Sequence, residues 1–201
     1  MRYTSELKGM DTLCQFVGVL ATTTTNAQVF PVNLIQTGTG SWNRIGRKVC
    51  LKSLRLMGIA NCDHFLNAGT DVEGNSMRVI VVWDRQPNGG TEPVFNDIFG
   101  QTYQAGTETT NWYSPPKYDT MSRYTILKDM QWNSSPGAAP TAGNYVRNNF
   151  YIDEFIRLND LESNYSGQST PMTIADINSG ALYVIARAQT NDTTRTQWII
   201  S

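Results

Sequence analysis

The stretch MRVIVVW, residues 77–83, decides the fold class that this sequence predicts. It is rich in β-branched residues and apolar at nearly every position, which is typical of a strand covered on both faces. The next residues, DRQPNGG at 84–90, place Pro, Asn and Gly where a tight turn requires them. Residues 77–90 therefore predict a buried strand and a turn with positive φ at a glycine, because glycine adopts such angles without steric cost.

The segment KVCLKSLRLMGIA, residues 48–60, predicts a second strand with an irregularity. Val49 and Leu51 alternate with polar residues, and the apolar phase then shifts to Leu54. We expect a β-bulge near Ser53, because an extra residue inserted into a strand produces such a shift.

Shorter apolar stretches predict six further strands, each bounded by clusters of Gly, Pro, Asn and Ser. They are Thr12–Leu20, Gln28–Ile35, Arg123–Trp132, Phe150–Leu158, Ala181–Ala188 and Gln197–Ile200. Helical signal is confined to PVFNDIFG at 93–100, which predicts one or two turns with Pro at the first helical position. The spacing of short strands predicts an all-β sandwich or barrel in one domain, residues 1–201.

The composition excludes several classes of protein. The 201 residues carry 16 Lys and Arg against 17 Asp and Glu, and this balance excludes a globally basic nucleic-acid binder. Charged residues make up 16% of the chain against about 25% in an average domain, and a surface poor in charge favours assembly. No apolar run approaches the roughly 18 residues of a membrane span and no signal peptide is recognisable. We therefore expect a soluble protein, intracellular when made, without membrane contact.

The patterns of catalytic and metal sites are largely missing from the sequence. His64 is the only histidine, which excludes a His-rich metal site, and we expect it to be a loop residue with local hydrogen bonds. Cys14, Cys50 and Cys62 form no C-x-x-C spacing, and neither a G-x-S-x-G pattern nor a phosphate-binding glycine loop is present. A pair of catalytic carboxylates stays open, with these candidates: Asp63, Asp71, Glu73, Asp84 and Asp97. We predict no enzymatic activity, no cofactor and no metal ion.

The charge distribution singles out one basic segment. No acidic residue lies between Asp11 and Asp63, whereas five cations do, which we predict to bind nucleic acid: Arg44, Arg47, Lys48, Lys52 and Arg55. If the apolar residues of this strand point inward, Lys48, Lys52 and Arg55 point outward on one face. Such a row can follow a phosphate backbone irrespective of base sequence. The alternatives are a solvated strand face or a contact between subunits.

Aromatic residues near cations give a second indication. Trp42 lies two residues before Arg44, and Trp112 and Tyr113 precede PPKY at 115–118. Exposed aromatic rings can stack on unpaired bases, and they are equally enriched in subunit contacts. Core packing is expected for the tryptophans inside strand patterns: Trp83, Trp132 and Trp198.

Several motifs follow one another from about Asn43 to the C-terminus. They are NRIGRKV at 43–49, LKSL at 51–54, RVIVVWDRQPNG at 78–89, DIF at 97–99, RY at 123–124, ILKD at 126–129 and SGALY at 179–183. In this order they resemble the capsid proteins of circular single-stranded DNA viruses, the circovirus-like or CRESS-DNA group. The combination of NRIGRKV with VVWDRQPNG is specific, whereas the first forty residues are weakly covered.

The resemblance implies an eight-stranded jelly roll of two packed antiparallel sheets with long loops. It also implies a structural coat protein that self-assembles into an icosahedral shell, with T=1 expected for one compact jelly roll, around a circular single-stranded DNA genome bound without regard to sequence. The implied locations are the virion and, during assembly, the host nucleus. Capsid proteins of this group usually begin with a long Arg/Lys-rich arm, whereas only Arg2 and Lys8 precede Arg44 here. The shell is expected despite this departure, but strong genome packaging is not implied.

A function of a different class fits the same features. A carbohydrate- or partner-binding jelly-roll module of the lectin kind would also use a surface poor in charge with exposed aromatic rings. Particle mass separates the two hypotheses, because the capsid protein forms megadalton particles and the lectin-like module forms small oligomers.

Overall fold

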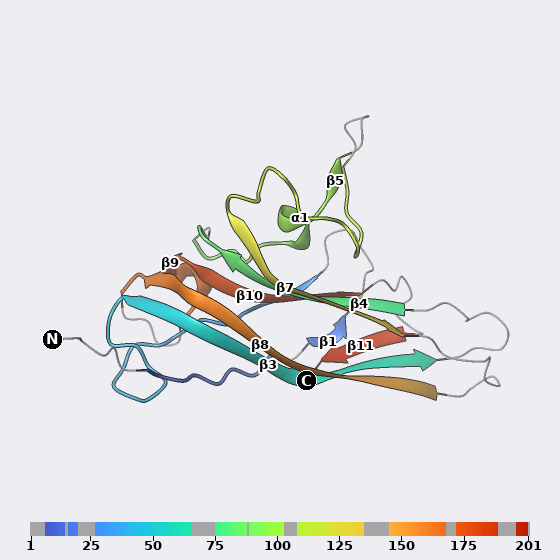
Figure 1. The fold of residues 1–201 in the computed structure, drawn as a ribbon, viewed down its shortest axis with the longest axis horizontal. Helices are drawn as coiled ribbons and strands as arrows, with labels where there is room; N and C mark the ends of the chain where they lie inside the picture. Colours follow the sequence, from blue (N-terminus) through green and yellow to red (C-terminus); the bar gives the residue numbers. More distant parts are fainter. Residues whose placement is uncertain are drawn as a thin grey trace.

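The computed structural model describes residues 7–14, 16–19, 27–65, 75–87, 89–102, 108–134, 145–167, 172–188 and 196–200. The strands are β1 (Phe16–Val19), β2 (Gln28–Pro31), β3 (Lys48–Phe65), β4 (Asn75–Asp84), β5 (Gln101–Thr102), β6 (Glu108–Thr109), β7 (Tyr124–Ser134), β8 (Tyr145–Tyr165), β9 (Ile177–Ser179), β10 (Ala181–Ala188) and β11 (Thr196–Ile200). The helical segments are α1 (Phe95–Ile98) and a 3₁₀ turn at Ile174–Asp176. Figure 1 shows their arrangement.

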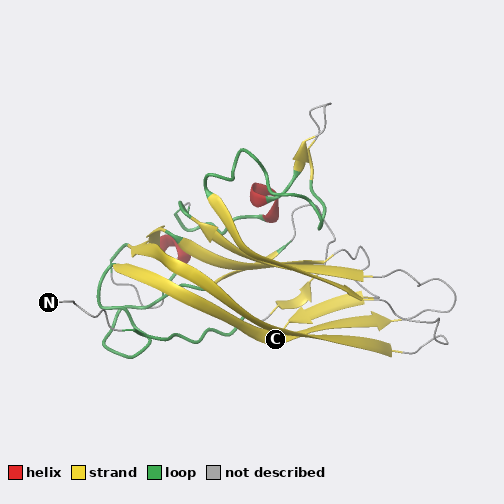
Figure 2. Ribbon diagram, in the orientation of Figure 1, coloured by secondary structure: helices red, strands yellow, loops and turns green. Residues whose placement is uncertain are grey.

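Two antiparallel sheets form the body of the molecule. One sheet has the strand order β1-β11-β3-β8-β9 and the other has the order β2-β10-β4-β7, while β5 and β6 pair separately. Figure 2 shows the two sheets as stacked layers, with loops above the upper one. Along the described strands the chain changes sheet six times, between β1 and β2, β2 and β3, β3 and β4, β7 and β8, β9 and β10, and β10 and β11. These crossings between two packed sheets confirm the predicted all-β, jelly-roll-like fold.

Each strand predicted from the sequence has a counterpart in the structure: β1, β2, β3, β4, β7, β8, β10 and β11. β3 and β8 are longer than predicted because they pair with each other along their whole length, from Lys48↔Asn164 to Phe65↔Tyr145. The strands β5, β6 and β9 are additional, and with two or three residues each they are too short to give a sequence pattern. The predicted helical turn is confirmed as α1, which begins at Phe95 rather than at the proline.

The expected irregularity in β3 is confirmed. The pairing of β3 with β8 shifts between Leu51 and Ser53, and Lys52 and Ser53 both face solvent. β8 contributes to the shift, because Leu161 pairs with Leu51 and Arg157 pairs with Ser53. Three residues of β8 therefore lie opposite the single residue Lys52 of β3, a bulge on the partner strand that the β3 sequence alone does not indicate.

The buried strand β4 contributes side chains to two apolar clusters, one on each face of its sheet. Met77, Val79 and Val81 belong to the apolar cluster between the sheets, together with residues of β8 and β10. Ile80 and Val82 belong to a second cluster that includes Phe95 of α1 and Phe99 directly after the helix. Because successive side chains of a strand point to opposite faces, both halves of MRVIVVW are buried. The prediction of a strand covered on both faces is confirmed.

The second face of β4 is covered by the chain between β4 and β7. We call the described part of residues 85–123 the cover; in Figure 1 it lies above β4, β7 and β10. Phe95 and Phe99 stack on each other with ring centroids 4.6 Å apart. The guanidinium carbons of Arg187 and Arg78 lie 4.4 Å and 4.5 Å from the centroids of these rings, respectively. Two paired sheet residues thus hold the cover by cation–π contacts.

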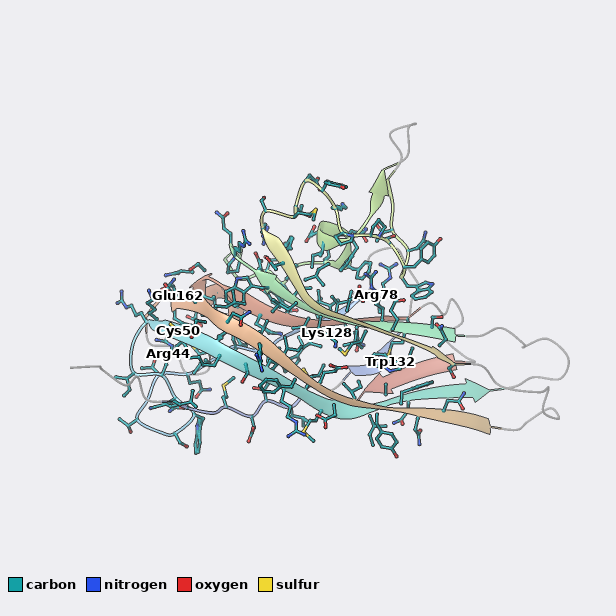
Figure 3. The ribbon with its side chains drawn as sticks, in the orientation of Figure 1. Arg44, Cys50, Arg78, Lys128, Trp132 and Glu162 are labelled. Carbon is teal, nitrogen blue, oxygen red and sulfur yellow. The ribbon has the colours of Figure 1, made fainter. Side chains whose placement is uncertain are left out.

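Polar contacts fix the cover further. Arg78 donates to the carbonyl oxygens of Trp112 and Ser114, at 3.0 Å and 2.8 Å, and also pairs with Asp129 of β7. Figure 3 shows the Arg78 side chain on the side of the sheet that faces the cover. At the two ends of the cover, the fully buried carboxylate of Asp84 accepts hydrogen bonds from Arg123 at 2.9 Å and 2.8 Å. The strand that enters the cover is therefore joined directly to the strand that leaves it.

Glycines permit two tight features of the backbone. The predicted turn after β4 has positive φ at Gly89 (37°) and Gly90 (104°), as expected. Gly180, between β9 and β10, has φ of 76° and lies against the core. A Cβ atom at Gly180 would lie 2.4 Å from the carbonyl oxygen of Glu162 and 2.6 Å from Cζ2 of Trp83. Gly167 has the same φ of 76°, but a Cβ atom there meets nothing within 4 Å.

We predict that Gly180→Ala destabilises the subunit by about 3–5 kcal/mol, because left-handed strain adds to a steric clash. Gly167→Ala is the matched control and should cost only the backbone strain, about 1–2 kcal/mol. Urea unfolding of the two variants and the parent measures both effects. Equal losses in the two variants would contradict the close approach at Gly180.

Candidate nucleic-acid interface

The outer face of the β3–β8 pair carries the cations predicted from the sequence. The side chains of Lys48, Lys52 and Arg55 are 61%, 52% and 57% exposed, respectively. They follow one another along β3 and point away from the other sheet, as the alternation of apolar residues predicts. We call these three residues the cation row.

Each member of the cation row is paired with an acidic side chain of β8. Lys48 pairs with Glu162, Lys52 pairs with Asp160, and Arg55 makes two hydrogen bonds to Asp153, of 3.0 Å and 3.1 Å. Figure 3 shows Glu162 and Cys50, its register partner on β3, side by side in the β3–β8 pair. The cation row is therefore the positive half of a ladder of exposed ion pairs, each of which contributes little to stability.

Hydrogen bonding within the ladder shifts the pKa values of its members. The bond to Glu162 raises the pKa of Lys48, and the bond to Asp160 raises the pKa of Lys52. The bonds from Arg55 and Lys48 lower the pKa values of Asp153 and Glu162. The Arg55–Asp153 and Lys48–Glu162 pairs are therefore complete above the ordinary carboxyl pKa and are lost in acid, as the pH falls through these lowered values. The ladder then becomes more positive.

The β8 bulge supplies the middle acid of the ladder. Asn159 and Asp160 have φ values of 48° and 63°, in the left-handed region that few residues other than glycine occupy. This conformation inserts the extra residues opposite Lys52 and brings the carboxylate of Asp160 to its ammonium group. Asn and Asp tolerate left-handed angles better than other residues with a side chain.

Arg44 lies apart from the other predicted cations. It is only 5% exposed, and its guanidinium carbon lies 4.5 Å from the ring centroid of Tyr165. Its nitrogens donate to the carbonyl oxygens of Ile35, Gly46 and Gly167 at 3.0 Å, 2.7 Å and 2.8 Å. Because these contacts bury the guanidinium, Arg44 joins the loop before β3 to the chain after β8, and we leave it out of the proposed interface.

Two arginines near the ladder have no acidic partner within the described part of the chain. Arg47 is exposed at the start of β3, and Arg157 is exposed on β8 opposite Ser53. With them, the described side chains of this surface include five cations against the three carboxylates of the ladder, whereas the whole chain has a net charge of -1. The outer face of β3–β8 is thus an electropositive region of a slightly acidic protein.

The aromatic candidates occupy separate places. Trp42 is 63% exposed in a loop closed by backbone hydrogen bonds before β3. Trp112 and Tyr113 make an edge contact at 5.7 Å on the cover, over the opposite sheet. Two exposed aromatic residues that the sequence analysis did not single out, Tyr151 and Phe155, lie on the outer face of β8.

The cysteine and carboxylate groups considered for catalysis or metal binding are either held by contacts within the fold or lie outside the described residues. Burial raises the pKa of the Cys14 thiol to about 12, so it is not a nucleophile at neutral pH. Asp84 is bound by Arg123, and Asp97 accepts the backbone N–H of Val94 at 2.9 Å. Among the described side chains, no three His, Cys, Asp or Glu residues gather at a point. Asp71 and Glu73 lie outside the described residues, as do the side chains of Cys62, Asp63, His64 and Trp198.

In the described chain the helical segments are only four and three residues long, and no helix has the length and apolarity needed to cross a membrane.

A family comparison places this fold in the class of coat proteins of single-stranded DNA viruses. The model of the geminivirus coat protein/nuclear export factor BR1 family matches residues 15–200, and the chain belongs to this family. No curated protein matches the chain in sequence. The match favours a structural viral coat protein over a lectin-like module or an enzyme. It identifies the geminivirus family, so the finer likeness to circovirus-like capsid proteins stays a prediction.

We predict that Arg44→Lys destabilises the subunit by about 1–3 kcal/mol, because an ammonium group cannot satisfy three separated carbonyl oxygens and loses the ring contact. Arg47→Lys is the matched control and should change stability by less than about 0.5 kcal/mol, since Arg47 is exposed. Thermal and urea unfolding of both variants measure the difference. An unaltered Arg44→Lys subunit would contradict the structural role of this arginine.

Proposed function

We propose that this chain is a coat subunit, a single domain over residues 1–201, whose copies close into an icosahedral T=1 shell around a circular single-stranded DNA genome. The observation that carries the proposal is the family match over residues 15–200, on a chain folded as two packed sheets. The low charged fraction of 16% is in keeping with a subunit that must associate with many copies of itself. One jelly roll per subunit suits the smallest closed shell.

The genome contact of this proposal is the outer face of β3–β8. Arg47, Lys48, Lys52 and Arg55 contact phosphates, and the carboxylates of the ladder hold three of these cations in place until a phosphate competes for them. Arg55 is suited to this exchange, because its two bonds to Asp153 leave three of its five N–H donors for another acceptor. Since phosphate contacts carry no sequence information, binding is independent of base sequence.

The proposed locations follow from the same family. A coat subunit resides in the virion, and a shell that encloses DNA is assembled in the host nucleus. The family description includes a nuclear export factor, which is consistent with traffic of this fold through the nucleus.

We predict that purified subunits form megadalton particles that contain nuclease-protected single-stranded DNA when assembled with a circular single-stranded DNA. Light scattering and negative-stain imaging measure the particles, and nuclease digestion followed by electrophoresis measures the protected DNA. Assembly over a range of pH and salt is the appropriate design, because weak subunit contacts depend on both. Monomers and small oligomers under all conditions would overturn the shell and favour the lectin-like module.

A further inference from the structure

Two aromatic side chains stand exposed on the β8 side of the candidate interface. Tyr151 is 78% exposed and Phe155 is 62% exposed. They lie four residues apart on one strand, so they share a face of the sheet at a separation of about 13 Å. Asp153, between them on the same face, binds Arg55 of β3. The two rings therefore flank the last ion pair of the ladder.

The strand register places each ring beside β3. Phe155 lies directly opposite Arg55, and Tyr151 lies directly opposite Ile59. Opposite residues of an antiparallel pair have Cβ atoms about 5 Å apart, so Phe155 and Arg55 extend from neighbouring positions, and the guanidinium of Arg55 reaches from there to Asp153. A surface that binds a single strand without sequence preference combines these two elements, cations for the phosphates and rings for the bases.

The opposite sheet does not offer a similar surface. Its outward-facing Tyr124 and Tyr183 are buried in the cluster under the cover. Its Arg78 and Arg187 lie on the rings of Phe99 and Phe95 of the cover. Within the described residues, the β3–β8 face is the sheet surface that combines exposed rings with a row of cations.

We propose that Tyr151 and Phe155 form a stacking platform for the bases of single-stranded DNA whose phosphates lie along the cation row. This inference rests on the proposed function and deepens it, because it assigns the contacts with bases as well as those with the backbone. Stacking on a ring accepts every base, so the platform strengthens binding without selecting a sequence.

Charge favours DNA over a second protein copy as the occupant of this face. Five cations against three carboxylates attract a polyanion, whereas two such faces brought together would repel each other. Asp153 separates the rings along β8, and the exposed Met57 of β3 lies opposite Asp153, so the rings belong to a mixed surface of charged and apolar side chains.

The test compares two probes that share a backbone and differ in their bases. One is an oligo-deoxythymidine, and the other is an abasic oligomer of the same length and charge. We expect the parent subunit to bind the thymidine oligomer more tightly, and we expect Tyr151→Leu/Phe155→Leu to lose about 5-fold or more of that affinity per ring. Affinity for the abasic oligomer, and the salt dependence of both, should stay as in the parent.

Tyr118→Leu is the matched control. Tyr118 is 93% exposed on the cover, over the opposite sheet, so its loss should leave the preference for bases unchanged. Thermal unfolding of each variant verifies the fold before binding is measured, and leucine keeps the apolar character of both positions. Binding is measured on subunits held in conditions that prevent assembly, so that the result does not depend on particle formation.

The outcomes separate this inference from the proposed function. If folded Tyr151→Leu/Phe155→Leu keeps the parent preference for bases, the platform does not exist, and a failure of that variant to assemble would then assign the rings to a subunit contact. A parent that binds both probes equally also overturns the platform but leaves the backbone contact intact. A parent that binds neither probe overturns the DNA contact itself.

Discussion

The hydrogen-bonded ion pair between Asp84 and Arg123 closes the two ends of the cover, and the rest of the structure depends on that closure. The end of β4 and the start of β7 pair at Asp84↔Tyr124, and Arg123 supplies there the charged partner that a carboxylate with 0% exposure needs. The chain between them is thereby kept over the outer face of β4, where Ile80 and Val82 would otherwise face water. With that sheet covered, the β3–β8 face is the sheet surface for which we propose the contact with the genome.

The carboxylates of β8 that pair with the cation row limit how strongly this row can bind a phosphate group. The three cations of the row are strongly basic, and hydrogen bonds to β8 keep them so. Because of these bonds, a phosphate group must displace a carboxylate from each cation. The favourable free energy of each phosphate contact is therefore smaller than it would be for an unpaired lysine. Exposed pairs are weak and screened by salt, which allows such exchange. In the proposed function, moderate contacts with DNA would permit both packaging and release.

The local sequence is informative for features that depend on the residues of a single strand. Continuous apolar character correctly predicted the burial of β4 on both faces, and the phase shift correctly predicted the irregularity near Ser53. The acids of the ladder were missed because β8 reaches β3 through register, across a separation that no local pattern reveals. Arg44 resembles its neighbours in sequence, and only its tertiary contacts distinguish it. Tyr151 and Phe155 could have been found, since they alternate with the buried Ile152 and Ile156 along β8.

We propose that the cation row contacts DNA phosphates although each of its members is paired with an acid. The most direct measurement is the salt dependence of single-stranded DNA affinity for Lys48→Gln/Lys52→Gln, compared with Arg85→Gln/Lys117→Gln on the cover. Each lost phosphate contact lowers the slope of log affinity against log salt by about 0.7, so the first variant should lose about 1.4 and the second nearly nothing. An unchanged slope in the first variant, or an equal loss in both variants, would show that Lys48 and Lys52 do not contact DNA phosphates.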